Sequence, residues 1–193
     1  MPTLPDLLTE LDLSVAELHA AKLDGLLLPI ASGFRSIDRP DGRAERAAAI
    51  ARLVPDRMIV GEESAAWIWG ALAEAPEPIR LSSRPRHRAR LPPSVEWVTR
   101  EMVIDEGDLA AIPLAGREPL VVTAPVRTAV DLARAATRPS AAAALRGMLV
   151  GGSVSADSVV AAIESQPRRP GRIAAIAAVR RADRHRDADQ PNG

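Results

Sequence analysis

The chain has 193 residues, 47% of them apolar, and its 25 basic and 25 acidic residues balance to a net charge of zero. This length and apolar content suit one ordinary domain or two small ones, and they argue against a disordered chain. Cysteine is absent and the three histidines lie far apart, so disulfides and cysteine-ligated zinc are excluded, and we expect no metal and no cofactor. We see neither a secretion signal nor the roughly 20 apolar residues of a membrane span, so we expect a cytoplasmic protein without membrane contact.

The charges are grouped in blocks along the chain. The net charge is −6 over residues 1–79, +5 over 80–100, −4 over 101–131 and +5 over 132–193. Segregated charge says more about binding partners than about fold. The two basic blocks are therefore places where an anion could be held, although 24 arginines against one lysine also fit a GC-rich genome.

The first forty residues predict a reduced winged helix. Leucines within residues 4–11 recur at the spacing of one helix face. Ser14 and Glu17 stand in capping-box register at the start of a second helix. The apolar and then alternating run over 26–38 contains a Ser-Gly turn and predicts a two-stranded hairpin. Helix, helix and hairpin in this order indicate a winged-helix-like domain over residues 1–57.

The middle of the chain alternates between helices and strands. Asp41 and Gly42 open a helix that Pro55 closes. Short apolar or alternating runs predict strands, with a helix between the first two, and these strands lie at 58–60, 79–83, 94–103 and 120–123. The loop between the second and third strands contains three prolines, which cannot donate to a β-ladder, so we interpret it as a stiffened hairpin loop.

The last third of the chain is helical. Pro125, Pro139 and Ser155 each begin a helix, a fourth helix follows Gly171, and residues 184–193 are predicted to form a disordered tail. The sequence therefore predicts an α+β fold. A mixed α/β domain over 58–193, with a small sheet and C-terminal helices, follows the winged-helix-like domain.

No catalytic pattern is complete. A metal-dependent nuclease needs an acidic residue two positions before a lysine, and the only lysine, Lys22, follows Ala20. The acidic group Asp105, Glu106 and Asp108 lacks the longer ladder of a calcium loop, and we interpret it as a solvated turn. Glu62 and Glu63 precede a helix, where acids are favoured by the helix dipole. We therefore predict that the protein is not an enzyme.

Two groups of side chains in the second domain stand out. Thr128 and Asp131 lie one helical turn apart with Arg127 beside them, and we favour a buried polar cluster that pins this helix to the sheet over a ligand site. Trp67 and Trp69 point to different helix faces. At most one of them should belong fully to the core, and the other is expected at an interface, where tryptophan is enriched.

These patterns together resemble the AbiEi-like antitoxins of type IV toxin–antitoxin systems, particularly their actinobacterial members. The stretch ESAAWIWGAL is similar to that family's Ser-Ala-Ala-x-x-x-Gly helix, and VTAPVRTAVDLAR is similar to its Thr-x-Pro-x-Arg-Thr-x-x-Asp-Leu signature. The matching residues are Ser64, Ala65, Ala66 and Gly70 in the first motif, and Thr123, Pro125, Arg127, Thr128, Asp131 and Leu132 in the second. Many actinobacterial relatives continue into an endonuclease-like domain, and we expect none in this chain.

The resemblance implies an antitoxin that acts as a transcriptional regulator: a winged helix that binds operator DNA, and a C-terminal domain that counteracts a nucleotidyltransferase toxin. A homodimer is left open. If DNA is bound, the second predicted helix and the wing contribute Ser14, Glu17, His19, Lys22 and Arg35. The arginine-rich loop would add sequence-independent phosphate contacts through Arg84, Arg86, Arg88 and Arg90.

The charge of the N-terminal half favours an alternative. Residues 1–40 carry six acids against Lys22, Arg35 and Arg39, whereas DNA-binding surfaces neutralise several phosphates. The alternatives are a protein-interaction module that does not bind DNA, and a catalytically inert remnant of a nuclease-fused protein. If a nucleic acid or an acidic partner is bound, the loop over 84–93 is the first place to look, although a plain solvated loop explains it too.

Overall fold

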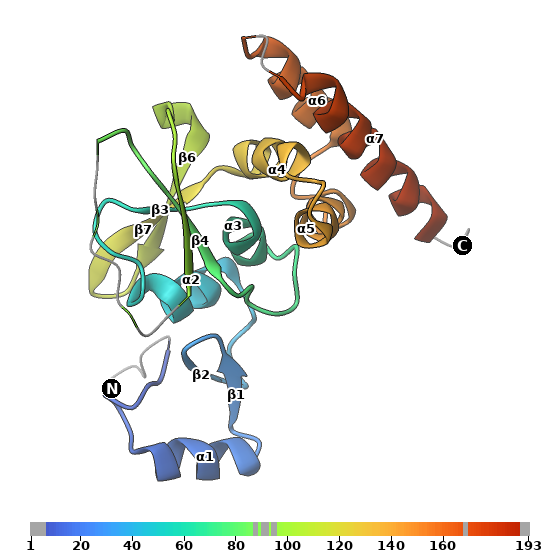
Figure 1. Ribbon diagram of the computed structural model, residues 1–193. Helices are drawn as coiled ribbons and strands as arrows, with labels where there is room; N and C mark the ends of the chain where they lie inside the picture. Colours follow the sequence, from blue (N-terminus) through green and yellow to red (C-terminus); the bar gives the residue numbers. More distant parts are fainter. Residues whose placement is uncertain (1–6, 87–88, 90–92, 94–95, 168–169, 190–193) are drawn as a thin grey trace.

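The computed structural model describes residues 7–86, 89, 93, 96–167 and 170–189, and for 185–189 the backbone only. Its elements form an α+β fold with three parts (Figure 1). A small N-terminal unit lies at one end, a five-stranded sheet with two helices lies in the middle, and a group of four helices completes the chain. None of the helices in the described ranges is long and apolar enough to cross a membrane.

The N-terminal unit consists of one helix and one hairpin. Helix α1 (Val15–Leu23) is followed by strands β1 (Leu27–Ile30) and β2 (Gly33–Ser36), which pair antiparallel as predicted. The expected capping box is present, because Ser14 Oγ accepts from the Glu17 amide at 3.3 Å and the Glu17 carboxylate accepts from the Ser14 amide at 2.9 Å. Each contact satisfies an amide that would otherwise lack a partner at the helix start.

The predicted helix over residues 4–11 is wrong for the residues that the structure describes. Leu8 forms an isolated antiparallel bridge with Phe34 of the hairpin, and a turn follows it. The leucines that suggested a helix face are buried instead in two directions. Leu8 packs with Leu18 and Leu27 inside the N-terminal unit, whereas Leu7 packs against the neighbouring core. A winged helix at the N-terminus therefore stays a prediction.

The central sheet is mixed, and its strand order is β5-β4-β3-β7-β6. Its strands are β3 (Ile59–Val60), β4 (Ile79–Ser83), β5 (Trp97–Glu101), β6 (Leu109–Leu114) and β7 (Arg117–Thr123). β3 pairs antiparallel with β4 and parallel with β7, and β6 pairs antiparallel with β7. Strand β6 was not predicted.

The loop after β4 is not a hairpin loop, which corrects the sequence interpretation. β4 and β5 run parallel, with Ile79 opposite Trp97 and Ser83 opposite Glu101. A parallel pair needs a crossover of about a dozen residues to return the chain to the starting edge. The segment between Ser83 and Trp97 provides this length, so the arginine-rich stretch connects two parallel strands and does not close a tight hairpin turn.

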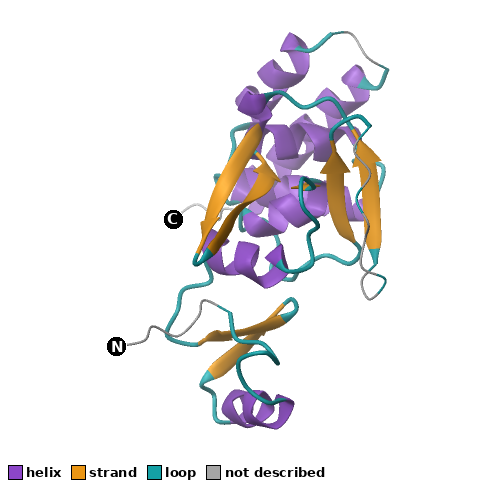
Figure 2. Cartoon of the chain, turned by 90° about the vertical axis from the view of Figure 1, so that its left-hand side faces the viewer, coloured by secondary structure: helices purple, strands orange, loops and turns teal. Residues whose placement is uncertain are grey.

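The two faces of the sheet are covered differently. Helices α2 (Arg43–Ala51) and α3 (Glu62–Ile68) pack on one face, against a core that includes Val60, Leu81 and Val122. Among the residues that the structure describes, the opposite face carries a small cluster around Ile59, Met102 and Ile104. The alternation of neighbours such as Ile59 and Val60 between these faces follows from the two-residue period of a strand. In Figure 2 the strands lie in front of most of the helices.

The C-terminal helices form the largest core. They are α4 (Pro125–Arg134), α5 (Pro139–Val150), α6 (Ala156–Ser165), capped by Ser155 as predicted, and α7 (Arg172–Asp189), which extends into the predicted tail. Helix α4 is buried on nearly all sides, because it contacts α3, α5, α6 and α7. A short 3₁₀ helix, η1 (Glu106–Asp108), precedes β6.

Candidate functional site

The two motifs of the family resemblance meet at one edge of the sheet. β3 and β7 are parallel neighbours, with Val60 opposite Val122, and each leads within two residues into a helix, α3 or α4. Parallel strands place their carboxyl ends at the same edge, so the first turns of α3 and α4 lie close together. Glu62 and Glu63 therefore come near the residues that surround Asp131.

Two glutamates at the start of α3 form ion pairs with three arginines from other elements. Glu62 lies within 3.6 Å of guanidinium nitrogens of Arg80 on β4, Arg100 on β5 and Arg138 at the start of α5. Glu63, only 2% exposed, accepts from Arg80 Nε at 2.7 Å and from Ser140 Oγ at 2.8 Å. The network therefore ties the sheet to the helical part of the chain.

Asp131 extends the same network across α4. Its carboxylate accepts from Arg127 Nε at 2.9 Å and from Arg100 Nη2 at 3.3 Å. Arg127 also donates to Asp108 in η1 and points a second nitrogen at the Met102 sulfur. Arg100 thus connects Glu62 at the start of α3 with Asp131 in the middle of α4, and Arg127 connects α4 with the segment before β6.

Burial and the neighbouring charges have opposite effects on the pKa values of Asp131 and Arg127. Burial raises the pKa of the Asp131 carboxyl from its ordinary value, and Arg127 and Arg100 act against that rise. For Arg127, burial alone would lower the pKa, but Asp131 and Asp108 together raise it. The Arg127 guanidinium therefore stays charged, and it stabilises the charged form of Asp131 where water is excluded.

Hydroxyl and indole groups join the ends of the two motifs. Thr128 Oγ1 donates to the backbone of the β7–α4 junction, with the carbonyls of Thr123 at 2.9 Å and Ala124 at 3.0 Å within reach. Trp69 Nε1 donates to the Thr123 carbonyl at 3.0 Å from the end of α3. Trp67 is buried in the sheet core, whereas Trp69 is half-buried between the sheet core and the helical core. Trp69 thus lies at an interface between two cores of this chain.

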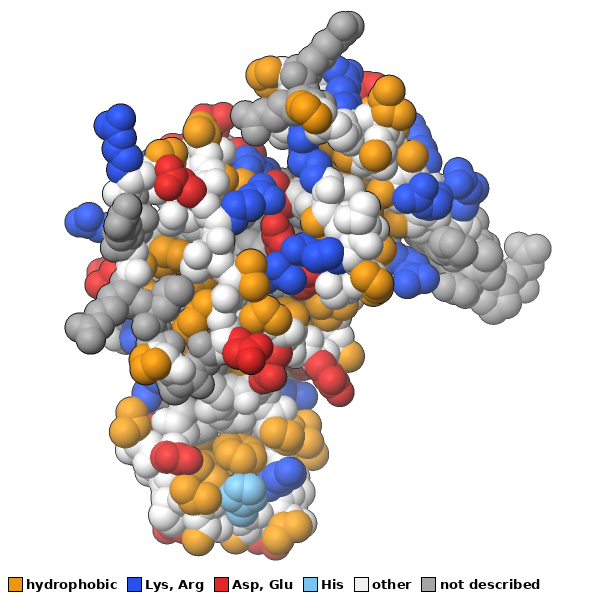
Figure 3. All heavy atoms as spheres, viewed as in Figure 1, with side chains coloured by type: hydrophobic (Ala, Val, Ile, Leu, Met, Phe, Trp, Pro, Cys, Tyr) orange, Lys and Arg blue, Asp and Glu red, His pale blue; other side chains and the backbone are white. Residues whose placement is uncertain are grey.

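A small cleft opens beside the network. It has a volume of about 240 Å³ and lies between β4, β5, the start of α3 and the α4–α5 connection. Its lining includes Glu62, Arg80, Arg100, Arg138 and Thr99. Figure 3 shows basic and acidic side chains alternating near the middle of the face in view. Among the residues that the structure describes, no group of three or more histidine, aspartate or glutamate side chains could hold a metal ion.

The N-terminal residues predicted to contact DNA lie on α1 and the hairpin. Ser14 and Glu17 are exposed but bind each other in the capping box. His19 is exposed and meets the Phe34 ring edge-on at a centroid distance of 6.0 Å, and Lys22 is exposed in the last turn. Arg35 donates to the carbonyl of Arg39 at 2.5 Å, so its guanidinium supports the turn after the hairpin.

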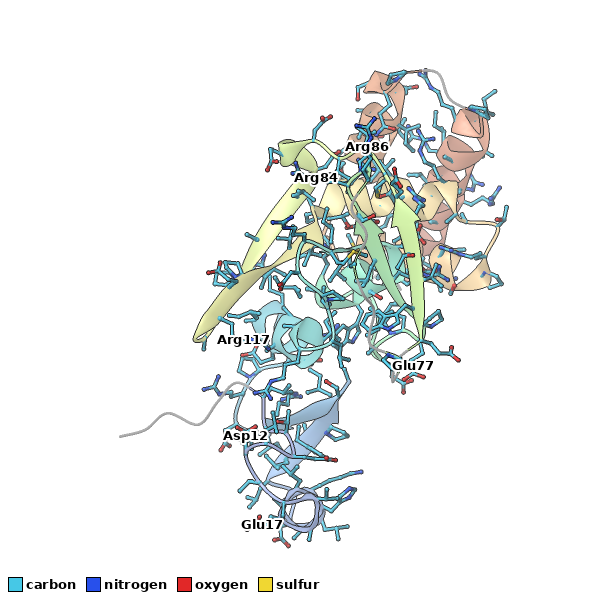
Figure 4. The ribbon with its side chains drawn as sticks, turned by 60° about the vertical axis from the view of Figure 1, so that its left-hand side comes forward. Asp12, Glu17, Glu77, Arg84, Arg86 and Arg117 are labelled. Atoms are coloured by element: carbon cyan, nitrogen blue, oxygen red, sulfur yellow. The ribbon has the colours of Figure 1, made fainter. Side chains whose placement is uncertain are left out.

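The arginines of the crossover segment lie elsewhere. Arg84 and Arg86 are exposed, Arg84 pairs with Glu106, and Arg86 has a backbone φ of +66°. Arg88 and Arg90 lie outside the described residues. Figure 4 places Arg84 and Arg86 at the opposite end of the molecule from Glu17 on α1. Arg84 and Arg86, the described members of this set, therefore do not form one continuous surface with the residues predicted on α1.

Several residues of the network were missed by the sequence interpretation. Glu62 and Glu63 were assigned to helix capping alone, and Arg80, Arg100 and Arg138 were given no role there. These five residues come from α3, β4, β5 and the start of α5, which are separated along the chain, so no local pattern reveals the cluster. A usable signal was the pair of adjacent acids at the start of a helix of small residues, in a chain with arginines on the strands that follow.

The fold and this network define an α+β domain built around paired strand-to-helix junctions. The family model described as the AbiEi antitoxin C-terminal domain matches residues 58–179, well over half of the chain. The chain belongs to the AbiEi antitoxin family. No curated protein matches it. Among solved structures, it is similar to the Rv2827c protein of Mycobacterium tuberculosis, with 16% identity and a TM-score of 0.42, over 98% of this chain and 78% of that one.

Proposed function

We propose that this protein is the antitoxin of a type IV toxin–antitoxin system, that it counteracts a nucleotidyltransferase-type toxin, and that it regulates its own operator. The observation that carries the proposal is the family match over residues 58–179, which begins at β3 and ends within α7. That range contains the whole sheet and the whole arginine–carboxylate network. We assign the antitoxin role to this part, as a binding protein without catalysis.

Neutralisation is tested by co-expression. A toxin gene adjacent to the antitoxin gene is induced alone, with the full chain, and with the full chain carrying Arg127→Gln, which weakens the junction between α4 and η1. Rescue of growth by the wild-type chain supports the proposal. Failure to rescue growth, with both proteins shown to be expressed and folded, contradicts it.

Operator binding is the second half of the proposal. The proposal is supported by one helix and one antiparallel hairpin in the N-terminal unit, with α1 as the candidate recognition helix and Lys22 and His19 exposed on it. Phosphate contacts make such binding strongly dependent on salt. Titration of promoter DNA at several salt concentrations should give an affinity that falls with salt. Absence of binding even at low salt would refute this half.

A second candidate function is supported by the surface of the N-terminal unit. Five large apolar side chains there are more than half exposed: Leu11, Val15, Leu23, Leu26 and Ile37. Ile37 donates its amide to the Leu26 carbonyl at 3.0 Å, so these two residues are adjacent. Together with the acidic balance of residues 1–40, exposed apolar side chains suit a protein partner better than a polyanion.

One pair of variants separates the two candidates. Leu23→Asp adds charge to the exposed apolar residues of α1, and Lys22→Glu reverses the neighbouring cation. A DNA-binding unit loses affinity for its promoter in Lys22→Glu. A protein-binding unit loses its protein partner in Leu23→Asp, whereas its DNA affinity is nil in every variant.

A further inference from the structure

The cleft beside Glu62 has the features of an oxyanion-binding site in which the Glu62 carboxylate occupies the position of the anion. Three guanidinium groups from three elements converge on the Glu62 carboxylate: Arg100 at 3.1 Å, Arg138 at 2.6 Å and Arg80 at 3.6 Å. Planar guanidinium groups bind the oxygens of phosphates as readily as those of carboxylates. The Glu62 carboxylate thus lies where a small anion would find three cations.

Arg138 has a donor that its contacts leave unused, and two of the three arginines are accessible to solvent. Nε of Arg138 is buried, and it finds no hydrogen-bond partner within the described part of the chain. A buried donor without a partner carries a desolvation cost, and it is uncommon in folded proteins. The side chains of Arg100 and Arg138 are 45% and 35% exposed, so an anion could reach them from solvent.

The backbone of Glu62 is strained. Its φ is +48°, in the left-handed region that favours glycine. Glu63, by contrast, is fully buried and held by Arg80, Arg138 and Ser140. The Glu62 side chain is 13% exposed against 2% for Glu63, so Glu62 is the glutamate that we expect an anion from solvent to displace.

The size of the cleft limits the ligand. At about 240 Å³ it is smaller than the roughly 300–1,000 Å³ of sites for drug-sized molecules. Ser82 and Thr99 add hydroxyl groups to its lining. We propose that this cleft binds a free phosphate or the terminal phosphate of a small molecule, and that Glu62 competes with that anion for Arg80, Arg100 and Arg138. This site is independent of the toxin and the operator.

The test measures phosphate affinity in the full chain. Glu62→Gln removes the competing charge, and Glu62→Gly removes it and also suits the positive φ. We expect both variants to bind inorganic phosphate and pyrophosphate at least about tenfold more tightly than wild type in calorimetric titrations at low salt. Adding Arg138→Gln to either variant should abolish this gain. Adding Arg117→Gln, at an exposed arginine that begins β7, should leave the gain unchanged.

A second measurement uses the wild-type chain, so that the test does not depend on the folding of any variant. Phosphate added to labelled protein should shift the arginine Nε signals of Arg100 and Arg138 before those of Arg117. An oligonucleotide without terminal phosphates is the comparison ligand. If neither Glu62 variant gains affinity for phosphate, or if only the oligonucleotide shifts these signals, the proposal is overturned.

Discussion

Arg46 fastens helix α2 to the end of α3 through a single buried guanidinium group. Its Nη1 donates to the carbonyls of Trp67 at 2.6 Å and Leu72 at 2.8 Å, and Nε and Nη2 bind both oxygens of Asp41. The guanidinium also lies over the Trp67 ring, 5.5 Å from its centroid. Asp41 thus balances a buried charge whose other contacts are to backbone carbonyls.

This contact makes stability depend on pH. The hydrogen bonds from Arg46 hold the pKa of Asp41 below its ordinary value, although partial burial opposes them. A depressed carboxyl pKa stabilises the folded state above the unfolded-state pKa of about 3.9, and that stabilisation is lost as the pH falls through the folded-state pKa. Asp41→Asn should therefore be less stable than wild type at pH 7, and the difference should shrink below about pH 4.

Urea unfolding followed by circular dichroism between pH 7 and pH 3 measures this difference in the free energy of unfolding. In an Arg46→Gln background the same Asp41→Asn substitution has lost its partner, and its effect should no longer vary with pH. A difference that stays constant down to pH 3 in the wild-type background would contradict the assignment.

At the scale of elements, helix α5 approaches the chain after α3 at a glycine. A Cβ on Gly147 would lie 2.0 Å from the carbonyl oxygen of Ala71, which is backbone and cannot rotate away. Gly147→Ala should therefore push α5 off its neighbour and lower the free energy of unfolding by about 1–3 kcal/mol. Gly107→Ala, where nothing lies within 4 Å of the added carbon, should change it by less than about 0.5 kcal/mol in the same urea titration. Equal effects of the two substitutions would show that the close approach of α5 does not limit stability.

Elements with local signals were predictable from the sequence, and those that depend on distant partners were not. Ser14 and Ser155 accept backbone amides at the starts of α1 and α6, and both interactions depend on residues within one turn. The direction of β5 relative to β4 depends on where the whole sheet closes, and no local pattern specifies that. The helix expected over 4–11 failed for a similar reason, because the pairing of Leu8 with Phe34 outweighs its helical leucine spacing.

The same division applies to the candidate site. Arg127, Thr128 and Asp131 could be selected because they fall within two turns of one helix. Arg80, Arg100 and Arg138 could not, because only the folded chain brings β4, β5 and α5 to Glu62. Charge blocks counted along the sequence place Glu62 and Arg100 in different blocks, although the two side chains are in contact.

At the scale of the whole molecule, the hydrophobic cores are of unequal size. The N-terminal unit is held by Leu8, Leu18 and Leu27 with a few half-buried neighbours, whereas the helical part buries a far larger set of side chains. Helix α2 belongs to the sheet, because it contacts β6, β7 and α3. The domain boundary predicted at residue 57 stays a prediction, and the position of α2 favours a boundary before Arg43.

Because so few side chains hold the N-terminal unit, we expect it to open before the rest of the chain unfolds. In native-state hydrogen exchange, amides of β1 and β2 should be less protected than those of α4 and α5, and α2 should exchange with the sheet if the boundary lies before Arg43. Leu18→Ala removes the most deeply buried side chain of the unit, for a cost of about 2–5 kcal/mol, so it should abolish protection in the hairpin and leave α4 unchanged. Loss of protection in α4 as well would mean that the N-terminal unit and the antitoxin domain unfold together. A partner bound at α1 would then also stabilise the domain to which we assign the antitoxin role.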